Sequence, residues 1–318
     1  MTGSEVLLAA GIDTVVGDPR WLPHPVRVMG RCIAWCDEHV RMICRGPGGL
    51  RLAGFCLALG LPVCVYAAGL ATIEAAASLS GWFGTAVSIL LASTTLAGRD
   101  LWDHAQAVRA HLQEGNLQGA RLAVAMIVGR DTKELSESDI TRATIETVAE
   151  STSDGIIAPL FYLAIGGAPL ALAYKAVNTL DSMIGHRDAR YIDFGWASAR
   201  LDDAANWLPA RLTALLLILA AGLLTGKVDR MQQGWRVLVR DGGKHPSPNS
   251  GRPEAAMAGV LGVRLGGRSN YDGVPHERPF LGEGLRGVAV GDAAIAMRIM
   301  ALTYLLGTLT AAGCLWLV

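Results

Sequence analysis

The chain has 318 residues, of which 51% are hydrophobic and 18% are charged, and its mean hydropathy is +0.34. Because a soluble domain carries about 25% charged residues, this composition argues against a soluble enzyme and favours a membrane protein. The 28 basic and 28 acidic side chains cancel. No basic stripe with interleaved aromatic residues is present, so we expect no nucleic-acid partner.

The amino-terminal region does not read as a cleavable signal peptide, because Glu5 and Asp13 bracket its short apolar stretch and no basic start precedes it. We expect a membrane-associated amphipathic helix there. Residues 17–30 contain three closely spaced prolines. Since proline fixes its own backbone and restricts the residue before it, this segment predicts a rigid extended loop.

Five stretches without Asp, Glu, Lys or Arg predict membrane helices. The predicted spans lie near residues 52–73, 75–98, 155–184, 208–226 and 299–318. The first two form a helical hairpin with a short turn near residues 78–81. Buried core helices of a large soluble enzyme are the alternative, but only Glu74 interrupts the apolar sequence from residue 52 to residue 98.

Three polar segments, 17–51, 99–154 and 227–298, contain most of the Lys and Arg residues. If they share one side of the membrane, the positive-inside rule makes that side cytoplasmic. The second segment predicts two helices separated near Gly115 and a further surface helix that begins with a Ser136 cap.

The apolar stretch 155–184 is interrupted at residues 166–169, which read Gly-Gly-Ala-Pro. Proline suits the first turn of a helix and glycine the position after its end, so 169–184 predicts a separate helix. The preceding half-helix is about 15 Å long and too short to span. We therefore expect an all-α, polytopic membrane protein with about four to five membrane helices, a re-entrant or broken helix pair, helical and loop cytoplasmic segments, and a single domain over 1–318.

Polar side chains gather on and after the predicted 169–184 helix, where apolar residues are expected. They are Lys175, Asn178, Asp181, Ser182, His186 and Arg187. Ionisable groups at membrane depth are costly and mark functional sites. A helix end that snorkels to the head groups is the alternative; it accounts for Lys175 but poorly for the others.

Asp202 and Asn206 are i, i+4 neighbours on one helical face. Carboxylate and amide oxygens suit Mg²⁺, which takes one or two carboxylates together with substrate phosphates. A solvated helix start at Asp202 and Asp203 is an equally good interpretation of this pattern.

The segment from His245 to Glu254 alternates prolines with polar residues, which favours an extended, constrained loop. Its candidate ligand-binding residues are Ser247, Asn249, Ser250 and Arg252. Arg252 offers a bidentate fork for phosphate or carboxylate. The segment is not a Walker A loop, because the chain contains no GxxxxGK[ST]. A polar loop without function is the alternative.

Two further candidates lie elsewhere in the chain. Asp154 directly precedes an apolar segment, and His24-Pro25 matches His245-Pro246. Either histidine could act as a base, a ligand or a spectator.

Five long blocks occur in order over most of the chain: GDPRWLPHPVRVMG, SDGIIAPLFY, YKAVNTLDSMIGHR, FGWASARLDDAANWLPARLTAL and HPSPNSGRPEAAMAG. Together they resemble the CobD/CbiB family of cobalamin biosynthesis, the adenosylcobinamide-phosphate synthases. Tyr271-Asp272-Gly273 departs from the family pattern, in which a second glycine is expected in place of Asp272.

The resemblance implies a multi-pass ligase of the inner (cytoplasmic) membrane whose active site faces the cytoplasm. It would join a carboxylate of adenosylcobyric acid to the amine of (R)-1-aminopropan-2-ol phosphate, or a related amino-alcohol phosphate, to give adenosylcobinamide phosphate. ATP would be the co-substrate and Mg²⁺ the metal. The expected partners are the corrinoid, the amino-alcohol phosphate, the lipid bilayer, a second copy of the chain and other enzymes of the pathway.

For that reaction we assign candidate roles by residue chemistry. The catalytic candidates are His186, His245 and Lys175, with either histidine as the proton acceptor. The candidates for substrate or phosphate binding are Arg187, Asn178, Ser247, Asn249, Ser250, Arg252, Asp154 and His24. The candidates for binding Mg²⁺ or its waters are Asp181, Asp202 and Asn206.

A transporter or carrier for a corrinoid or another anionic solute is the alternative function, because broken helices near charged residues also mark transporter sites. The small number of spans and the large polar segment 227–298 weigh against it.

Overall fold

The computed structural model describes residues 1–19, 24–44, 46–271 and 273–317. Five helical segments among them are long and apolar enough to cross a membrane. They are Pro47–Leu79, Gly81–Gln113, Glu137–Ile184, Trp207–Thr225 and Val290–Leu317. The predicted all-α polytopic class is confirmed, with the span count at the upper end of the expected number.

The chain forms two compact units, each assembled from separate stretches of sequence. The first comprises Met1–Ala97, Ala158–Asn206 and Thr308–Val318. The second comprises Gly98–Ile157 and Trp207–Gly307.

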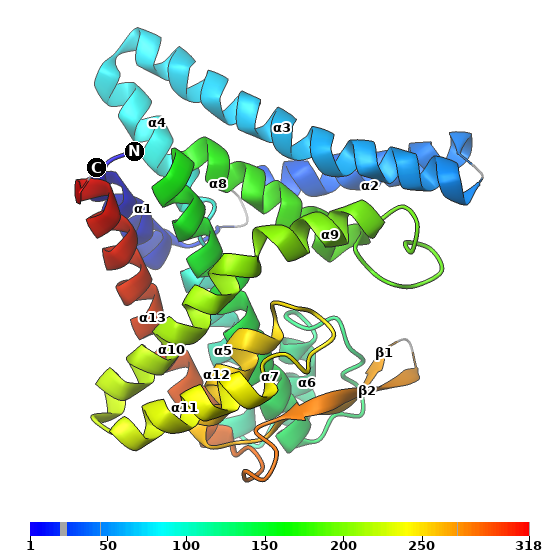
Figure 1. Ribbon diagram of the computed structural model, residues 1–318, viewed down its shortest axis with the longest axis vertical. Coiled ribbons are helices and arrows are strands. Elements are labelled where there is room, and N and C mark those ends of the chain that lie inside the picture. Colours follow the sequence, from blue (N-terminus) through cyan, green and yellow to red (C-terminus); the bar gives the residue numbers. More distant parts are fainter. Residues whose placement is uncertain (20–23, 45, 272, 318) are drawn as a thin grey trace. The chain divides into compact units, whose positions relative to one another are not determined.

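The first unit is helical throughout its described elements (Figure 1). Its helices are α1 (Gly3–Val16), α2 (Pro25–Ile43), α3 (Pro47–Leu79), α4 (Gly81–Ser93), α8 (Ala158–Ile184) and α9 (Trp196–Ala205), and it receives the end of α13 (Val290–Leu317). Helix α3 packs along α4, α8 and α9. Ile33 of α2, Leu180 of α8 and Phe194 lie in one fully buried cluster, which joins α2 to α8.

The predicted extended loop over 17–30 is wrong from residue 25 onward, because α2 begins at Pro25. Proline is favoured at the first helical position, where a backbone N–H has no partner in any case. His24 is the N-cap, and its Nδ1 accepts the N–H of Val26 at 3.3 Å. Residues 20–23 of the predicted loop lie outside the described residues.

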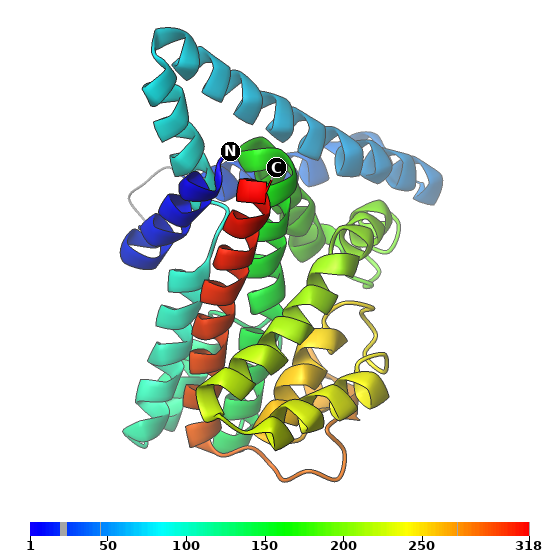
Figure 2. The ribbon, with the colours of Figure 1, turned by 60° about the vertical axis from the view of Figure 1, so that its left-hand side comes forward.

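Helices α3 and α4 form the predicted hairpin, which Figure 2 shows from a second direction. The turn is at Ser80, whose Oγ accepts the N–H of Phe83 at 3.3 Å. Helix α3 therefore continues past Glu74 and ends at Leu79. At its other end, the guanidinium of Arg51 stacks 4.4 Å from the ring centroid of Trp196.

Helix α8 is broken at the predicted position, and its ribbon changes direction along its length in Figure 1. Gly166 and Gly167 have non-helical backbone angles, with φ of +66° at Gly167, and Pro169 follows in the first turn of the second half. A positive φ at this point favours glycine. The chain enters α8 through a π-helical turn, η1 (Ser153–Ile157). The expected broken helix is therefore present, with its break at Gly166 and Gly167.

The second unit combines helices with one hairpin that the sequence did not predict. Its elements are α5 (Gly98–Gln113), α6 (Leu117–Val124), α7 (Glu137–Thr152), η1, α10 (Trp207–Thr225), α11 (Val228–Asp241), α12 (Gly251–Leu261), the antiparallel strands β1 (Leu265–Tyr271) and β2 (Val274–Leu281), and most of α13. The break between α5 and α6 lies at the predicted glycine, and Ser136 forms a capping box with Asp139. Asp272 lies outside the described residues.

Helix α7 is not the surface helix that its polar residues predicted. Ile140, Ile145 and Val148 are fully buried, and the helix contacts α5, α6, α12 and β1. Glu146 is buried with them, and a buried carboxylate needs partners.

A single methyl group at Gly54 of α3 should destabilise the first unit. An added Cβ there would overlap the carbonyl group of Phe194, whereas one at Gly60 of the same helix meets no other atom within 4 Å. We expect Gly54→Ala to cost about 1–3 kcal/mol through overpacking. Gly60→Ala should be neutral or slightly stabilising, because alanine favours a helix. Thermal unfolding of the two variants in detergent measures the difference, and equal midpoints would contradict this packing.

Candidate functional site

A tight loop between α8 and α9 brings α9 back against α8. The N–H of Gly185 donates to the carbonyl of Asp181 at 2.7 Å, which ends α8. An added Cβ at Gly195 would overlap the carbonyl of Ile184. The return of the chain therefore depends on glycine at this close approach.

Asp37 of α2 anchors the same loop. It is 4% exposed, and it accepts hydrogen bonds from Arg190 at 2.7 Å and from Tyr191 at 3.3 Å. Arg41 also donates to it at 2.7 Å. Burial alone would raise the pKa of Asp37, but the hydrogen bonds from Arg190 and Arg41 leave it below its ordinary value. Asp37 is thus a charge-compensated, structural carboxylate.

The returning helix places Asp202 beside two polar residues of α8, Asp181 and Asn178. Burial and the neighbouring charge of Asp181 raise the pKa of Asp202 to about 7, while the amides of Asn206 and Asn178 oppose that rise. Of the metal-binding candidates from the sequence, the structure therefore brings together Asp181, Asp202 and Asn206. It adds Asn178, which we had assigned to substrate.

Two stacked tyrosines of α8 fix the end of α9. The hydroxyl of Tyr174 donates to Asn206 Oδ1 at 2.8 Å, and that of Tyr162 donates to the carbonyl of Ala205 at 2.9 Å. Their rings lie 4.9 Å apart and nearly parallel. Asp202 Oδ1 and Asn206 Nδ2 are buried without a hydrogen bond to any other described residue.

The oxygen atoms of this cluster are of the kind that Mg²⁺ prefers in proteins. The carboxylates of Asp181 and Asp202 repel each other in a poorly solvated position. Oδ1 of Asp202 has no hydrogen-bond donor among the described residues. Among the described residues no group of three or more His, Cys, Asp and Glu side chains could hold a metal by itself. Two carboxylates with amides suit an ion that keeps waters and binds phosphate oxygens.

The remaining candidates of the first unit lie at varied depths. Lys175 is half-buried on α8, and His186 and Arg187 are exposed in the loop that follows. Burial raises the pKa of Asp203, and the positive charges of Arg200 and Arg187 oppose this rise. Arg187 therefore lies close enough to α9, the helix of Asp202 and Asp203, to act on Asp203. His24 is buried, and its Nε2 lies 3.1 Å from Asp18 Oδ1.

A second group of polar residues is built in the second unit, on the loop before α12. The turn that leads into it is held by Asp241, which is fully buried. This carboxylate accepts from Lys244 Nζ and from the N–H of Gly282, both at 2.8 Å, and from Arg240 at 2.7 Å. These donors outweigh burial and hold the pKa of Asp241 well below its usual range. Asp241 is thus a charge-compensated, structural carboxylate of the second unit, as Asp37 is of the first.

The backbone fixes the tautomer of His245. The N–H of Ser247 donates to His245 Nδ1 at 3.0 Å, so a neutral ring carries its proton on Nε2. His24 has the same arrangement with the N–H of Val26. Both histidines therefore have one nitrogen occupied by the backbone two residues further along, and only Nε2 is available to other groups.

His245 Nε2 faces Glu254 Oε1 of α12 across 4.0 Å. Both atoms are buried and make no hydrogen bond within the described residues. Burial and the charge of Arg278 lower the pKa of His245. Burial and the neighbouring Glu146 and Glu150 raise the pKa of Glu254 well above its ordinary value. The two groups are too far apart to bond each other, and a hydroxyl or phosphate oxygen placed between them could bond to both.

A carboxylate of α7 supports the 245–254 loop. Ser250 Oγ donates to Glu150 Oε1 at 2.7 Å and lies 3.2 Å from Ser247 Oγ. Ser247 Oγ in turn accepts the N–H of Asn249 at 3.3 Å. Three of the predicted binding residues are therefore joined in one small network with Glu150.

A second carboxylate of α7, Glu146, ties the hairpin to the helix. Arg130 Nη2 donates to Glu146 Oε2 at 2.6 Å, and the N–H of Gly266 donates to Glu146 Oε1 at 2.8 Å. Arg130 also donates to Ser269 Oγ at 3.2 Å.

The other two candidates of this unit are Arg252 and Asp154. Arg252 is on α12 with its Nε buried and without a hydrogen bond to another described residue. Asp154 is half-buried in the π-helical turn.

Sequence reasoning missed Arg130, Glu146 and Glu150, and it did not single out Glu254. The available signal was the i, i+4 spacing of Glu146 and Glu150 on the same side of α7. We attributed those acidic residues to a solvated face, whereas the apolar residues of α7 are buried on several sides.

Replacing Asp202 with asparagine should remove a pH-dependent loss of stability. An ordinary aspartate has a pKa near 3.9, and that of folded Asp202 is about 7. The fold therefore favours the protonated form, and the stability present below about pH 4 is lost as the pH rises through 7. Each pKa unit corresponds to about 1.4 kcal/mol, so the loss is on the order of a few kcal/mol.

Asp202→Asn protein should accordingly be more stable than the wild type at pH 8 without divalent cations, and the difference should shrink at pH 5. Unfolding in detergent with a chelator at both pH values measures it. Adding Mg²⁺ at pH 8 should stabilise the wild type more than the variant. An equal difference at both pH values would show that Asp202 is ionised without penalty.

Comparison with known proteins agrees with the sequence blocks. A family model described as CobD/Cbib protein matches residues 6–300. Cobalamin biosynthesis protein CobD of Geobacter metallireducens is 49% identical over 288 residues, which cover 89% of this chain and 87% of that protein. Cobalamin biosynthesis protein CobD of Klebsiella pneumoniae is 47% identical over 290 residues, with 91% and 90% covered.

Cobalamin biosynthesis protein CbiB of Salmonella typhi is 45% identical over 308 residues, which cover 95% of each chain. No solved structure matches. With the family model covering most of its length and these relatives aligned nearly end to end, the chain belongs to the CobD/Cbib family.

Proposed function

We propose that this chain is an ATP-dependent amide ligase of cobalamin biosynthesis. It would join a carboxylate of adenosylcobyric acid to the amine of (R)-1-aminopropan-2-ol phosphate, or of a related amino-alcohol phosphate. Family membership supports the pathway, because the relatives are named cobalamin biosynthesis proteins. The observation that carries the ligase chemistry is the uncompensated carboxylate of Asp202 beside Asp181, which calls for a cation.

The reaction needs activation because a carboxylate is a poor acyl donor. Transfer of the terminal phosphoryl group of ATP to a carboxylate oxygen gives an acyl phosphate and ADP. The amine then attacks the carbonyl carbon, the C–O bond to phosphate breaks, and inorganic phosphate leaves. The attacking ammonium group loses two protons in all, one before attack and one as the amide forms.

The first unit supports the phosphoryl-transfer part of this reaction. Asp181, Asp202 and Asn206 would hold Mg²⁺ or its waters, and the ion would neutralise charge on the phosphates. Lys175 is half-buried on α8, one turn before Asn178, and we propose that it contacts a phosphate. The exposed Arg187 near Asp203 would provide a second cation.

The second unit supports proton transfer and binding. Glu254 has a raised pKa, which makes its ionised form a stronger base than an ordinary carboxylate. We therefore propose that Glu254 accepts the proton of the amine. His245 carries its proton on Nε2 and can donate it to an oxygen. Ser247 and Asn249 would orient substrate, and the buried Nε of Arg252 offers a donor for phosphate or carboxylate.

We place the protein in the cell membrane with its polar segments in the cytoplasm. Most of the Lys and Arg residues lie in the segments between the apolar helices, and such residues favour the cytoplasmic side.

The proposal is tested on the full-length protein purified in detergent and supplied with adenosylcobyric acid, aminopropanol phosphate, ATP and Mg²⁺. Mass spectrometry of the corrinoid should show the gain of one amide-linked amino-alcohol phosphate, dependent on ATP. Corrinoid binding without any mass gain, together with uptake in vesicles, would favour a transporter or carrier instead. That function needs no product and no ATP-dependent bond formation.

Asp202→Ala should lower kcat by about 100-fold or more, since it removes a group that acts on the charged transition state. Asp203→Ala is the matched control, because Asp203 is adjacent on α9 and its ion-pair contact is with Arg200 at 3.7 Å. Arg252→Ala should lower kcat/KM by a similar factor. Turnover of the Asp202 or Arg252 variant at the wild-type rate would remove the corresponding assignment.

A further inference from the structure

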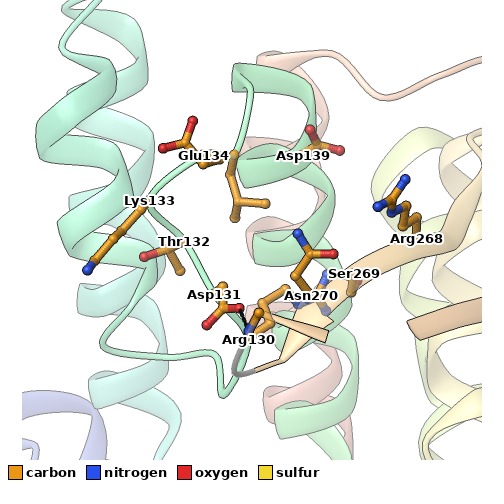
Figure 3. Close-up of a pocket in the computed structure, with 11 residues that line it drawn as sticks. Arg130, Asp131, Thr132, Lys133, Glu134, Asp139, Arg268, Ser269 and Asn270 are labelled. Carbon is orange, nitrogen blue, oxygen red and sulfur yellow. Dashed lines mark hydrogen bonds between the residues drawn. The ribbon is translucent and has the colours of Figure 1, made fainter. Parts of the chain in front are cut away.

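A cavity of about 800 Å³ lies in the second unit between the loop before α7 and strand β1 (Figure 3). Its charged lining residues are Arg130, Asp131, Lys133, Glu134, Asp139 and Arg268. This volume is typical of small-molecule sites. None of these six residues was among the site candidates from the sequence.

The walls of the cavity are fixed by groups that already have partners. The N–H of Asp131 donates to the carbonyl of Asn270 at 2.9 Å, and Asp131 Oδ2 accepts the N–H of Gly273 at 2.8 Å. Asp139 accepts from Ser136 and Arg142. These contacts hold the loop against the hairpin, and Arg142 neutralises the charge of Asp139, whereas Asp131 accepts only a backbone N–H.

Arg130 makes the inner wall. Its side chain is 7% exposed and is paired with Glu146, so its charge is neutralised. Its charge also lowers the pKa of Glu254, although burial and two glutamates raise that pKa overall. Arg130 therefore links the cavity to Glu254, the carboxylate that we propose accepts the proton of the amine.

Among the described residues, four charged side chains of the lining make no ion pair: Asp131, Lys133, Glu134 and Arg268. All four are exposed toward solvent. In Figure 3, Lys133 and Glu134 lie on the loop on one side of the cavity, and Arg268 and Asn270 lie on strand β1 on the other. The unpaired charges are thus two positive and two negative, with the amide of Asn270 on the same strand as Arg268.

This arrangement discriminates among ligand classes. A divalent cation would meet Lys133 and Arg268, and a nucleoside triphosphate would meet three acidic side chains and find no aromatic surface for its base among the lining residues. Inorganic phosphate would use neither Glu134 nor Asp131. A small molecule that carries both a phosphate and an ammonium group can pair with side chains of both signs, with a guanidinium for the phosphate.

We propose that this cavity binds the amino-alcohol phosphate. The phosphate would bind to Arg268 and Asn270, the ammonium to Glu134, and Lys133 would offset the remaining negative charge. This inference rests on the proposed function for the identity of the ligand, while the cavity and its charges stand by themselves. Arg130 would act as a positioning residue between the bound amine and the Glu146–Glu254 carboxylates.

The test compares three ligands on the full-length protein in detergent by titration calorimetry: 1-aminopropan-2-ol phosphate, 1-aminopropan-2-ol and inorganic phosphate. We expect the first to bind at least tenfold more tightly than either fragment. Arg268→Ala and Glu134→Gln should each weaken that binding at least tenfold. Arg264→Ala and Glu283→Gln are matched controls of the same unit outside the cavity, and both should bind like the wild type.

Steady-state kinetics separates this inference from the proposed function. In the ligase assay, Arg268→Ala and Glu134→Gln should raise KM for the amino-alcohol phosphate at least tenfold and leave KM for ATP unchanged. Amide product with an unchanged KM for the amine in both variants would overturn the cavity assignment and leave the ligase standing. Ligand binding that the two substitutions abolish, without amide product, would retain the cavity and overturn the ligase. Equal binding of inorganic phosphate would overturn the zwitterion assignment.

Discussion

The burial of Asp202 beside Asp181 is the constraint on which the candidate site of the first unit depends. Burial and the repulsion from Asp181 raise the pKa of Asp202 to about 7, so the fold keeps two carboxylates together at a cost in stability. The surrounding contacts make that possible, because Tyr174 holds Asn206 and the glycine-dependent loop holds α9 against α8. Such strain is expected where a charge is reserved for a ligand.

The buried carboxylates of the protein fall into two groups by their hydrogen-bond donors. Asp37 and Asp241 are saturated by arginine, lysine, tyrosine or backbone donors, and their pKa values fall although both are buried. Asp202 and Glu254 have an oxygen without a donor among the described residues, and their pKa values rise. The first group stabilises the fold. The second group has a carboxylate oxygen that is available to a cation, a proton or a substrate. Asp202 lies beside Asp181, and Glu254 faces His245, and both neighbours were candidates from the sequence.

Local chemistry predicted much of the fold, and long-range pairing accounts for what was missed. The Gly-Gly-Ala-Pro break in α8 and the Ser136 cap could be read directly, because each depends on neighbouring residues. Pro25 was misread because the same residue suits both a loop and a first helical turn. Glu146 accepts hydrogen bonds from Arg130 and Gly266, and Gly266 lies 120 residues from Glu146 along the chain. The β hairpin gave no alternating apolar pattern, since Gly266 and Gly267 stand where strand residues were needed.

Helix α3 carries one ionisable side chain toward each end of its apolar stretch, Arg51 and Glu74. At 1.5 Å per residue they are separated by about 34 Å, close to the roughly 30 Å thickness of bilayer hydrocarbon. The whole helix of 33 residues is longer than the bilayer core, and such a mismatch is relieved by tilting, by kinking or by local thickening of the bilayer. Because α8 and α9 pack on α3, any tilt that α3 adopts is shared by the two helices that carry Asp181 and Asp202.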